Sequence, residues 1–289
     1  MTSINTNTAA MAALQTLRSV NNNLETTQGR VSSGYRVGEA KDNAAYWSIA
    51  TTMRSDNKAI GAASDALGLG AAKVDVAYAA AQSSLDVLNE IKAKVVSTTE
   101  TSVDDTKVAD EIKQLQNQLV SIANSASFSG ENWMLGSATN SVVTGFVRTS
   151  SGVQVTTEAV DNSKFYLFGA SANGTASTTA GLLSTIMSIN ATSLNATNVA
   201  TALSTVETAI AALTTGAATL GAVSSRIDIQ TEFANSLSDA IDSGVSRLVD
   251  ANMEEESARL SALQTQQQLA IQSLSIANSS SQNILSLFR

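Results

Sequence analysis

A repeat of apolar residues every seven positions runs through residues 53–95 and decides the fold. The stretch reads MRSDNKAIGAASDALGLGAAKVDVAYAAAQSSLDVLNEIKAKV. The repeated positions are Met53, Ile60, Leu67, Val74, Ala81, Leu88 and Val95. Such a repeat keeps one seam of a helix facing a partner helix. Because each helical residue adds 1.5 Å, the repeat predicts a rod of roughly 60 Å or more.

A second ladder with the same spacing occupies the C-terminal half. Its members are Val199, Val206, Leu213, Leu220, Ile227, Ala234, Ile241 and Leu248, with a companion row at Leu203, Ile210, Ala217 and Val245. Between the ladders, apolar residues alternately four and three apart over 108–126 predict a third helix that folds back antiparallel on the first. We predict four core positions on these seams, which are Leu88, Leu115, Leu213 and Leu220.

Two further amphipathic segments lie at the ends of the chain. Apolar residues from 4 to 31 predict an N-terminal helix that ends near Gly34, and residues 35–43 read as an irregular connector. At the other end, residues 250–259 form a charged joint before a weakly amphipathic, uncharged helix over 260–288. Six glutamines in that last segment argue against insertion into a membrane.

The centre of the chain has a strand-like pattern. Residues 141–148 and 153–160 are rich in β-formers and flank a turn-like stretch at 149–152, which predicts a hairpin. Residues 165–168 are a candidate third strand, and 169–181 read as loop. The predicted fold class is therefore mainly α, a long antiparallel helical bundle or coiled coil formed by the N- and C-terminal halves, with a small central β-hairpin insert.

Composition limits the chemistry that the chain can perform. Proline, cysteine and histidine are all absent from the 289 residues. Without histidine or cysteine, the usual general base, thiol nucleophile and zinc ligands are missing. The formal net charge of −8, without clustered Lys or Arg, disfavours nucleic acid as a partner. We expect no enzyme activity and no cofactor.

The few candidate chemical motifs have plainer explanations. The carboxylates of Glu254, Glu255 and Glu256 point in different directions on a helix, so we expect a solvated first turn and no metal cage. Residues 104–105 are best explained as a helix start. Asn-x-Ser/Thr triplets begin at Asn173 and at residues 190 and 195, but they arise easily in an Asn- and Thr-rich chain, and we assign them no role.

Both termini carry motifs found in one protein family. The N-terminal motifs are MTSINTN (1–7), RVSSGYRVG (30–38) and AKDNAA (40–45), and the C-terminal ones are SRLVDANMEEES (246–257) and QNILSLFR (282–289). In their order and spacing these motifs resemble the two terminal signatures of bacterial flagellins. The resemblance covers both ends and nearly all of the two ladders.

The resemblance implies a structural subunit that polymerises with itself, and possibly with other flagellins, into a hollow extracellular filament for swimming. Residues 1–45 and 255–289 would form the inner tube, residues 46–127 and 181–254 the outer helical core, and residues 128–180 a small insert. Export through the flagellum would replace a secretory signal, which the N-terminus lacks. The implied partners are an export chaperone, a filament cap and hook-junction proteins.

Three alternatives to a flagellin are weighed. A hook–filament junction protein shares similar terminal helices, although it usually diverges in the connector and tail that match here. A non-flagellar coiled-coil adaptor or membrane-active bundle would also show heptads. An enzyme could sit in the central insert, as metalloprotease inserts do in some flagellins, but the absence of histidine rules out that zinc chemistry here.

Candidate functional residues follow from the seams, the connector and the resemblance. The expected assembly residues are Ile4, Met11, Leu14, Leu17, Leu24, Arg30, Arg36, Asp42, Asn43, Leu263, Leu274, Ile284, Leu285, Leu287 and Phe288. Many flagellins carry an R-x-R-E-L-like motif that toll-like receptor 5 binds, and Glu90 and Lys94 stand where an arginine and the leucine would be. This departure predicts weak receptor recognition. We also expect the thin apolar seams at both ends to fold only on assembly.

Overall fold

The computed structural model describes residues 7–100, 103–149, 152–194 and 198–287. Five helices are present in these ranges, namely α1 (Thr8–Ser33), α2 (Ala44–Ser97), α3 (Asp105–Ser125), α4 (Val199–Val249) and α5 (Met253–Leu287). The chain divides into two compact units, residues 58–238 and residues 1–57 together with 239–289. Helices α2 and α4 contribute to both units.

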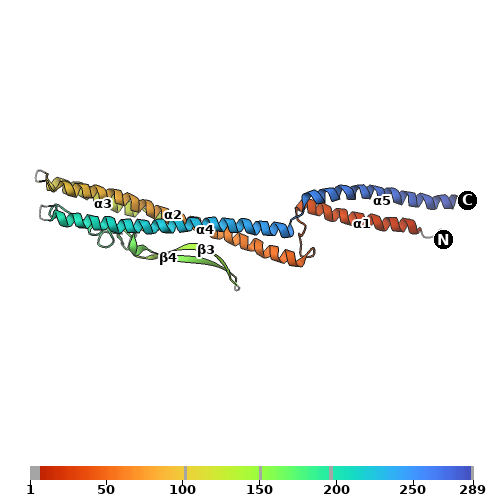
Figure 1. Cartoon of the computed structure of the whole chain (residues 1–289), viewed down its shortest axis with the longest axis horizontal. Coiled ribbons are helices and arrows are strands. Elements are labelled where there is room, and N and C mark those ends of the chain that lie inside the picture. Colours follow the sequence, from red (N-terminus) through yellow and green to blue (C-terminus); the bar gives the residue numbers. More distant parts are fainter. Residues whose placement is uncertain (1–6, 101–102, 150–151, 195–197, 288–289) are drawn as a thin grey trace. The chain divides into compact units, whose positions relative to one another are not determined.

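Within residues 58–238, α2, α3 and α4 lie side by side (Figure 1). The α2–α4 pair is antiparallel, because the Ser224 hydroxyl lies 3.4 Å from Asp75 and, seventeen residues on along α2 and seventeen back along α4, Lys92 lies 3.0 Å from Glu207. The seven-residue ladders form the core as predicted. The buried members within this unit are Ile60, Leu67, Val74, Ala81, Leu88, Val95, Val199, Val206, Leu213, Leu220 and Ile227.

Helix α3 starts where its sequence predicts. The Asp104 carboxylate accepts a hydrogen bond from the Thr106 amide at 3.0 Å and caps the helix. That bond holds the pKa of Asp104 below its ordinary value. The prediction of a core position at Leu115 is wrong, since this side chain is half-buried. The neighbouring Gln116 is buried instead, because its amide donates to the carbonyls of residues 186 and 189 at 2.8 and 3.0 Å.

The central hairpin is confirmed, with longer strands than predicted. Strands β3 (Thr139–Thr149) and β4 (Gly152–Asp161) pair antiparallel, with a bulge between Val143 and Gly145. Val142 and Val160 are buried at the base of this hairpin. Arg226 of α4 forms an ion pair with Glu158 of β4, which fixes the hairpin against that helix.

The prediction of a third strand at residues 165–168 is wrong. A short 3₁₀ helix, η1 (Asn162–Lys164), precedes it, and only a single bridge joins Leu135 to Phe168. The apolar residues there form a fully buried plug, with the Leu167 amide donating to the Met134 carbonyl at 2.8 Å. Such a plug produces the same short apolar run as a strand.

Smaller elements complete the insert. Strands β1 (Ser127–Phe128) and β2 (Glu131–Asn132) form one short pair, and a second 3₁₀ helix, η2 (Ile186–Ser188), packs into the core. The expectation that 169–181 is entirely loop is wrong, because β5 (Gly169–Ala170) pairs with β6 (Ala176–Ser177). The hairpin of these two short strands is held to the end of α3 by a 2.7 Å bond from the Ala176 amide to Asn124 Oδ1.

Helix α4 is also long and apolar enough to cross a membrane by length and composition. A core helix meets the same criterion, and the apolar residues of α4 include the buried ladder positions Val206, Leu213 and Leu220. Packing against α2 and α3 therefore accounts for its composition.

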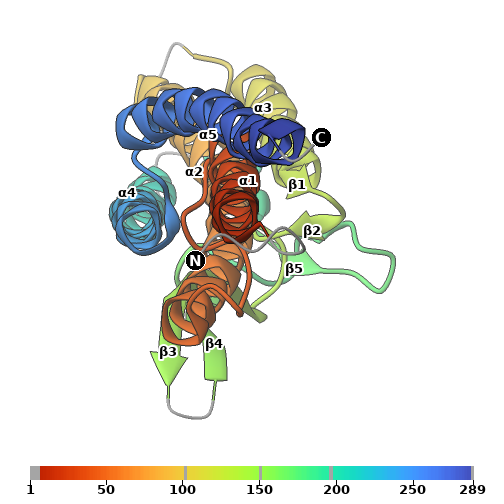
Figure 2. The same ribbon diagram turned by 90° about the vertical axis from the view of Figure 1, so that its right-hand side faces the viewer.

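In the other unit, α1 and α5 pack against each other as an antiparallel pair, which Figure 2 shows end-on. Near one end of the pair, the side-chain amide of Asn7 donates a 2.9 Å hydrogen bond to the Ala277 carbonyl. A small apolar cluster of Val37, Ala50, Val245 and Val249 holds the connector and the adjoining parts of α2 and α4 together.

Candidate assembly site

A joint within the unit of residues 1–57 and 239–289 connects the terminal helices to the long helices, and the chain passes through it twice. Helix α1 ends at Gly34, whose φ of 75° places it in the left-handed region that glycine tolerates. Only residues 250–252 separate α4 from α5. The two crossings bond to each other through their backbones, because Arg36 and Val37 donate to the Val249 carbonyl at 2.7 and 3.1 Å and Ala251 donates to the Gly34 carbonyl at 2.9 Å.

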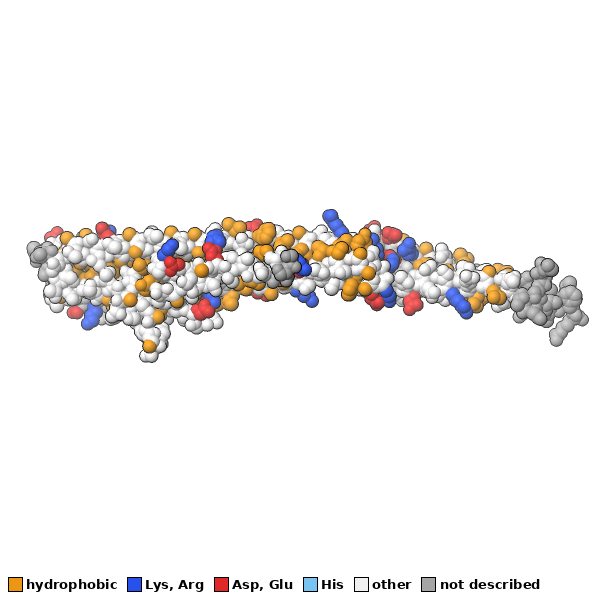
Figure 3. Space-filling model, turned by 90° about the horizontal axis from the view of Figure 1, so that it is seen from below, with side chains coloured by type: hydrophobic (Ala, Val, Ile, Leu, Met, Phe, Trp, Pro, Cys, Tyr) orange, Lys and Arg blue, Asp and Glu red, His pale blue; other side chains and the backbone are white. Residues whose placement is uncertain are grey.

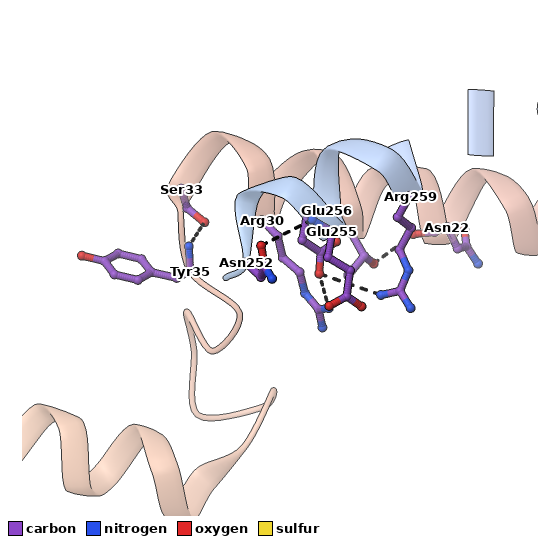
Figure 4. Close-up of polar contacts among 9 residues, drawn as sticks. Asn22, Arg30, Ser33, Tyr35, Asn252, Glu255, Glu256 and Arg259 are labelled. Carbon is purple, nitrogen blue, oxygen red and sulfur yellow. Dashed lines mark hydrogen bonds and ion pairs between the residues drawn. The ribbon is translucent and has the colours of Figure 1, made fainter. Parts of the chain in front are cut away.

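A buried carboxylate lies where α1 meets the first turn of α5. Arg30 of α1 donates to Glu256 at 3.1 Å, and Arg259 lies 3.8 Å from the same oxygen. Figure 4 shows the Glu256 carboxylate between the two guanidinium groups. The expectation of a solvated first turn holds for Glu254 and Glu255 but is wrong for Glu256, which is 6% exposed. Its partner lies 226 residues away in sequence, beyond the reach of any local pattern.

The other connector residues also make defined contacts. Arg36 donates to the Leu248 carbonyl at 3.1 Å, and Asn43 caps α2 by accepting from the Tyr46 amide at 3.2 Å. The Asp42 carboxylate accepts from the amides of residues 39 and 38 at 3.1 and 3.0 Å. The bond from the residue 39 amide, and next the bond from the residue 38 amide, hold the pKa of Asp42 below its ordinary value.

Sequence reasoning missed two contacts that tie the joint and the terminal pair together. Arg54 of α2 lies 4.8 Å from the centroid of the Tyr35 ring, a cation–π geometry. Gln267 donates to Asn21 across the α1–α5 pair at 2.8 Å. The partners of each contact lie on different elements of the chain, so neither contact leaves a periodic signal in the sequence.

The predicted apolar assembly residues occupy different environments. Leu263 is buried between α1 and α5, and Leu17, Leu24 and Leu274 are half-buried there. Met11 and Leu14 are exposed. Ile4 and Phe288 lie outside the described residues, and the side chains of Ile284, Leu285 and Leu287 do so as well.

Three large apolar side chains of α5 are exposed to solvent. Leu269, Ile271 and Ile276 are all more than half exposed, and Ile276 reaches 69%. A groove of about 290 Å³ between the two helices is lined by small and apolar side chains that include Ala13 and Val20. These exposed side chains and the groove are apolar surface that a neighbouring molecule could cover.

The described residues offer little for catalysis. Among them, no group of three or more potential ligands could hold a metal ion. On the face shown in Figure 3, Lys and Arg lie among Asp and Glu, and no large patch of one sign is seen.

Comparison with known proteins identifies the family. The model of the bacterial flagellin N-terminal helical region matches residues 4–139, and that of the C-terminal helical region matches residues 203–288. The chain is 52% identical to Flagellin C and 46% identical to Flagellin A of Rhizobium meliloti (strain 1021), and 48% identical to a flagellin of Brucella melitensis biotype 1, each match covering all of both chains. The chain belongs to the bacterial flagellin family.

As a flagellin, the chain is a structural subunit that self-polymerises into the extracellular flagellar filament, and it is not an enzyme. The comparisons give no support to the hook-junction or adaptor alternatives. The two matched regions contain nearly all of the five helices and the ladders, whereas residues 140–202, with most of the β3–β4 hairpin, lie between them.

The positions that depart from the receptor motif lie on α2 of this flagellin. Glu90 is exposed, and Lys94 forms a 2.6 Å ion pair with Glu111 of α3. That pairing raises the pKa of Lys94. Next to Glu90, Ile91 is fully buried in the core, so only part of this segment presents side chains to solvent.

Proposed function

We propose that the α1–α5 pair is the polymerising element of this subunit, and that residues 1–45 and 255–289 line the inner tube of the filament. Residues 46–127 and 181–254 would form the outer tube, with residues 128–180 as a small outermost insert. The observation that carries the proposal is the apolar area left uncovered on the terminal pair, in particular at Met11, Leu14, Leu269, Ile271 and Ile276.

Energetics favour completion of this pair by neighbouring subunits. Only Val20 and Thr27 of α1 are buried, and in α5 only Glu256 and Leu263 among the side chains described. Ordering a residue costs roughly 1–2 kcal/mol of backbone entropy. Burial of apolar surface stabilises by about 25 cal/mol per Å². The α1–α5 seam buries too little apolar surface to offset the entropy cost unless neighbouring subunits cover more of it. Folding of the ends and assembly would thus be coupled.

The joint residues would then set the direction in which the terminal pair leaves the long helices. Arg30, Arg36, Asp42 and Asn43 each bond a group in or beside the joint, as described above. Charge-assisted bonds to backbone and carboxylate groups fix orientation more strongly than neutral ones. We expect an alanine at Arg30 to disturb filament shape or yield while leaving the unit of residues 58–238 folded.

Further partners follow from family membership alone. An export chaperone, a filament cap and hook-junction proteins would bind the subunit before or during assembly. Toll-like receptor 5 would respond weakly to the purified monomer, because Glu90 and Lys94 replace residues of the motif that it recognises. Strong signalling by the monomer would contradict this assignment.

Polymerisation of purified variants tests the proposal. Ile276→Ser changes an outward apolar residue of α5, and Gln268→Ser on the same helix is the matched control, since Gln268 is exposed and polar. We expect I276S to slow filament growth seen by electron microscopy, while Q268S grows normally. Removal of residues 284–289 should abolish or severely weaken filaments.

Hydrogen exchange supplies the second readout. Residues of α1 and α5 should gain protection only after assembly, whereas the core of α2 and α4 should be protected in the monomer as well. Strong protection of both terminal helices in the free monomer, or normal filaments from the truncated chain, would contradict the proposal.

A further inference from the structure

We propose that Asn173 is a site of spontaneous covalent modification, at which the side-chain amide is lost through attack by the backbone nitrogen of Gly174. Asn173 lies in the turn between β5 and β6 and is exposed. It begins the only Asn-Gly pair in the 289 residues. Glycine has no Cβ, so the nitrogen that must attack is less hindered here than before any other residue.

The reaction needs only water. The Gly174 nitrogen gives up its proton to a base and bonds to Cγ of Asn173, and the Cγ–amide bond then breaks to release ammonia. The resulting five-membered imide is opened by water at either carbonyl. One opening leaves an ordinary aspartyl residue at this position, and the other leaves an isoaspartyl residue whose side-chain carbon has entered the backbone. Either product adds one negative charge to a chain whose formal charge is −8.

Two other asparagines that precede a serine are better protected. Asn124 precedes a serine, but its Oδ1 accepts the Ala176 amide at 2.7 Å and it lies within α3. Asn162 also precedes a serine, yet it is only 1% exposed. Asn173 combines exposure, a turn and a following glycine, and no hydrogen bond of its side chain is found within the described chain.

The hairpin itself controls how fast the reaction runs. In the folded turn the Gly174 amide donates to the Ser171 carbonyl at 2.9 Å, and Gly174 has a φ of 75°. Attack on Asn173 requires that this bond break and the turn open. Opening is cheap, because β5 and β6 pair over two residues each and such isolated hairpins are marginally stable. The rate therefore reports local opening of this hairpin.

Mass spectrometry of the purified, folded chain after incubation at mildly alkaline pH tests the proposal. We expect a gain of about one mass unit confined to the peptide with Asn173, with both aspartyl and isoaspartyl forms. The gain should be absent in Asn173→Gln. In the denatured chain, where strain in the turn no longer contributes, it should be slower by roughly tenfold in Gly174→Ala, because the methyl group hinders attack. The Asn190 peptide, also exposed but followed by alanine, is the internal control.

Two comparisons separate hairpin control from simple sequence chemistry. Ser171→Ala removes the 2.9 Å bond from Ser171 Oγ to the Thr175 carbonyl, so it should raise the rate severalfold while circular dichroism is unchanged. Denatured wild-type chain should react faster than folded chain, and S171A should no longer differ from it in denaturant. An unmodified Asn173, a reaction equally fast at Asn190, or equal rates in folded and denatured chain would overturn the inference.

Discussion

The same substitution, glycine to alanine, should have opposite effects at two positions five residues apart on α4. At Gly216 an added Cβ would lie 2.7 Å from Cβ of Phe165, 2.9 Å from the Lys164 carbonyl oxygen and 3.1 Å from Cα of Phe165. At Gly221 the nearest atom would be Cε2 of Tyr78 at 3.9 Å, an ordinary contact. We expect Gly216→Ala to destabilise the unit of residues 58–238 and Gly221→Ala to stabilise it.

The magnitude follows from two effects. Replacing glycine by alanine inside a helix gains about 0.5–1 kcal/mol at either position, so helix propensity cancels when the two variants are compared. The obstructing atoms at Gly216 belong mainly to backbone and cannot rotate away. Forcing a methyl group into a packed site costs about 1–3 kcal/mol. The free energy of unfolding should therefore differ between the variants by about 1–3 kcal/mol.

Tryptophan fluorescence during chemical denaturation measures this difference. The chain has two tryptophans, and a Trp47→Phe background leaves Trp133, which is 3% exposed in the core of this unit. Both variants should unfold with the same denaturant dependence and shifted midpoints. If G216A were as stable as G221A, the close approach of residues 164–165 to α4 would not limit packing, and the reasoning would fail.

Four further substitutions test the core and one helix cap. Leu213→Ala should lower the free energy of unfolding by about 2–5 kcal/mol and the half-buried Leu115→Ala by less, measured by the same denaturation assay; equal losses would contradict the burial difference. Gln116→Leu should cost about 1–3 kcal/mol because it leaves a buried carbonyl without its donor, and no change would show that the carbonyls find other partners. The folded-state pKa of Asp104 is lowered, so its cap stabilises α3 at neutral pH, and this stabilisation is lost as the pH falls through about 4 and below. Asp104→Asn should remove this pH dependence of unfolding. If the dependence were retained, it would belong to another carboxylate.

The helices could be predicted from the sequence because their signals are local and periodic. Most positions of the two heptad ladders are buried, as their spacing predicts, and Asp104 and Gly34 mark helix ends by chemistry that acts within a few residues. The hairpin was predictable for the same reason, since β-formers on either side of a short turn specify it. The bundle architecture follows from these elements, as long antiparallel seams have few ways to pair.

What could not be predicted depends on partners distant in the chain. Glu256 looks like its exposed neighbours Glu254 and Glu255 until Arg30 meets it in space. Gln116 reads as a surface residue of α3, but it is buried where it donates to the carbonyls of residues 186 and 189, just before α4. Residues 165–168 form a core plug because of backbone bonds to residues 134–136, and no period in the sequence records those bonds.

The backbone hydrogen bonds across the joint restrict which substitutions its residues tolerate during evolution. The donors are the amides of Arg36, Val37 and Ala251, and the acceptors are the carbonyls of Gly34 and Val249. Every residue except proline has a backbone N–H, so other substitutions at the three donor positions leave these hydrogen bonds in place. Proline at any of the three donor positions would cut it. These backbone bonds therefore exclude proline, which the chain lacks throughout, from three positions, in addition to the glycine that the φ of 75° favours at position 34.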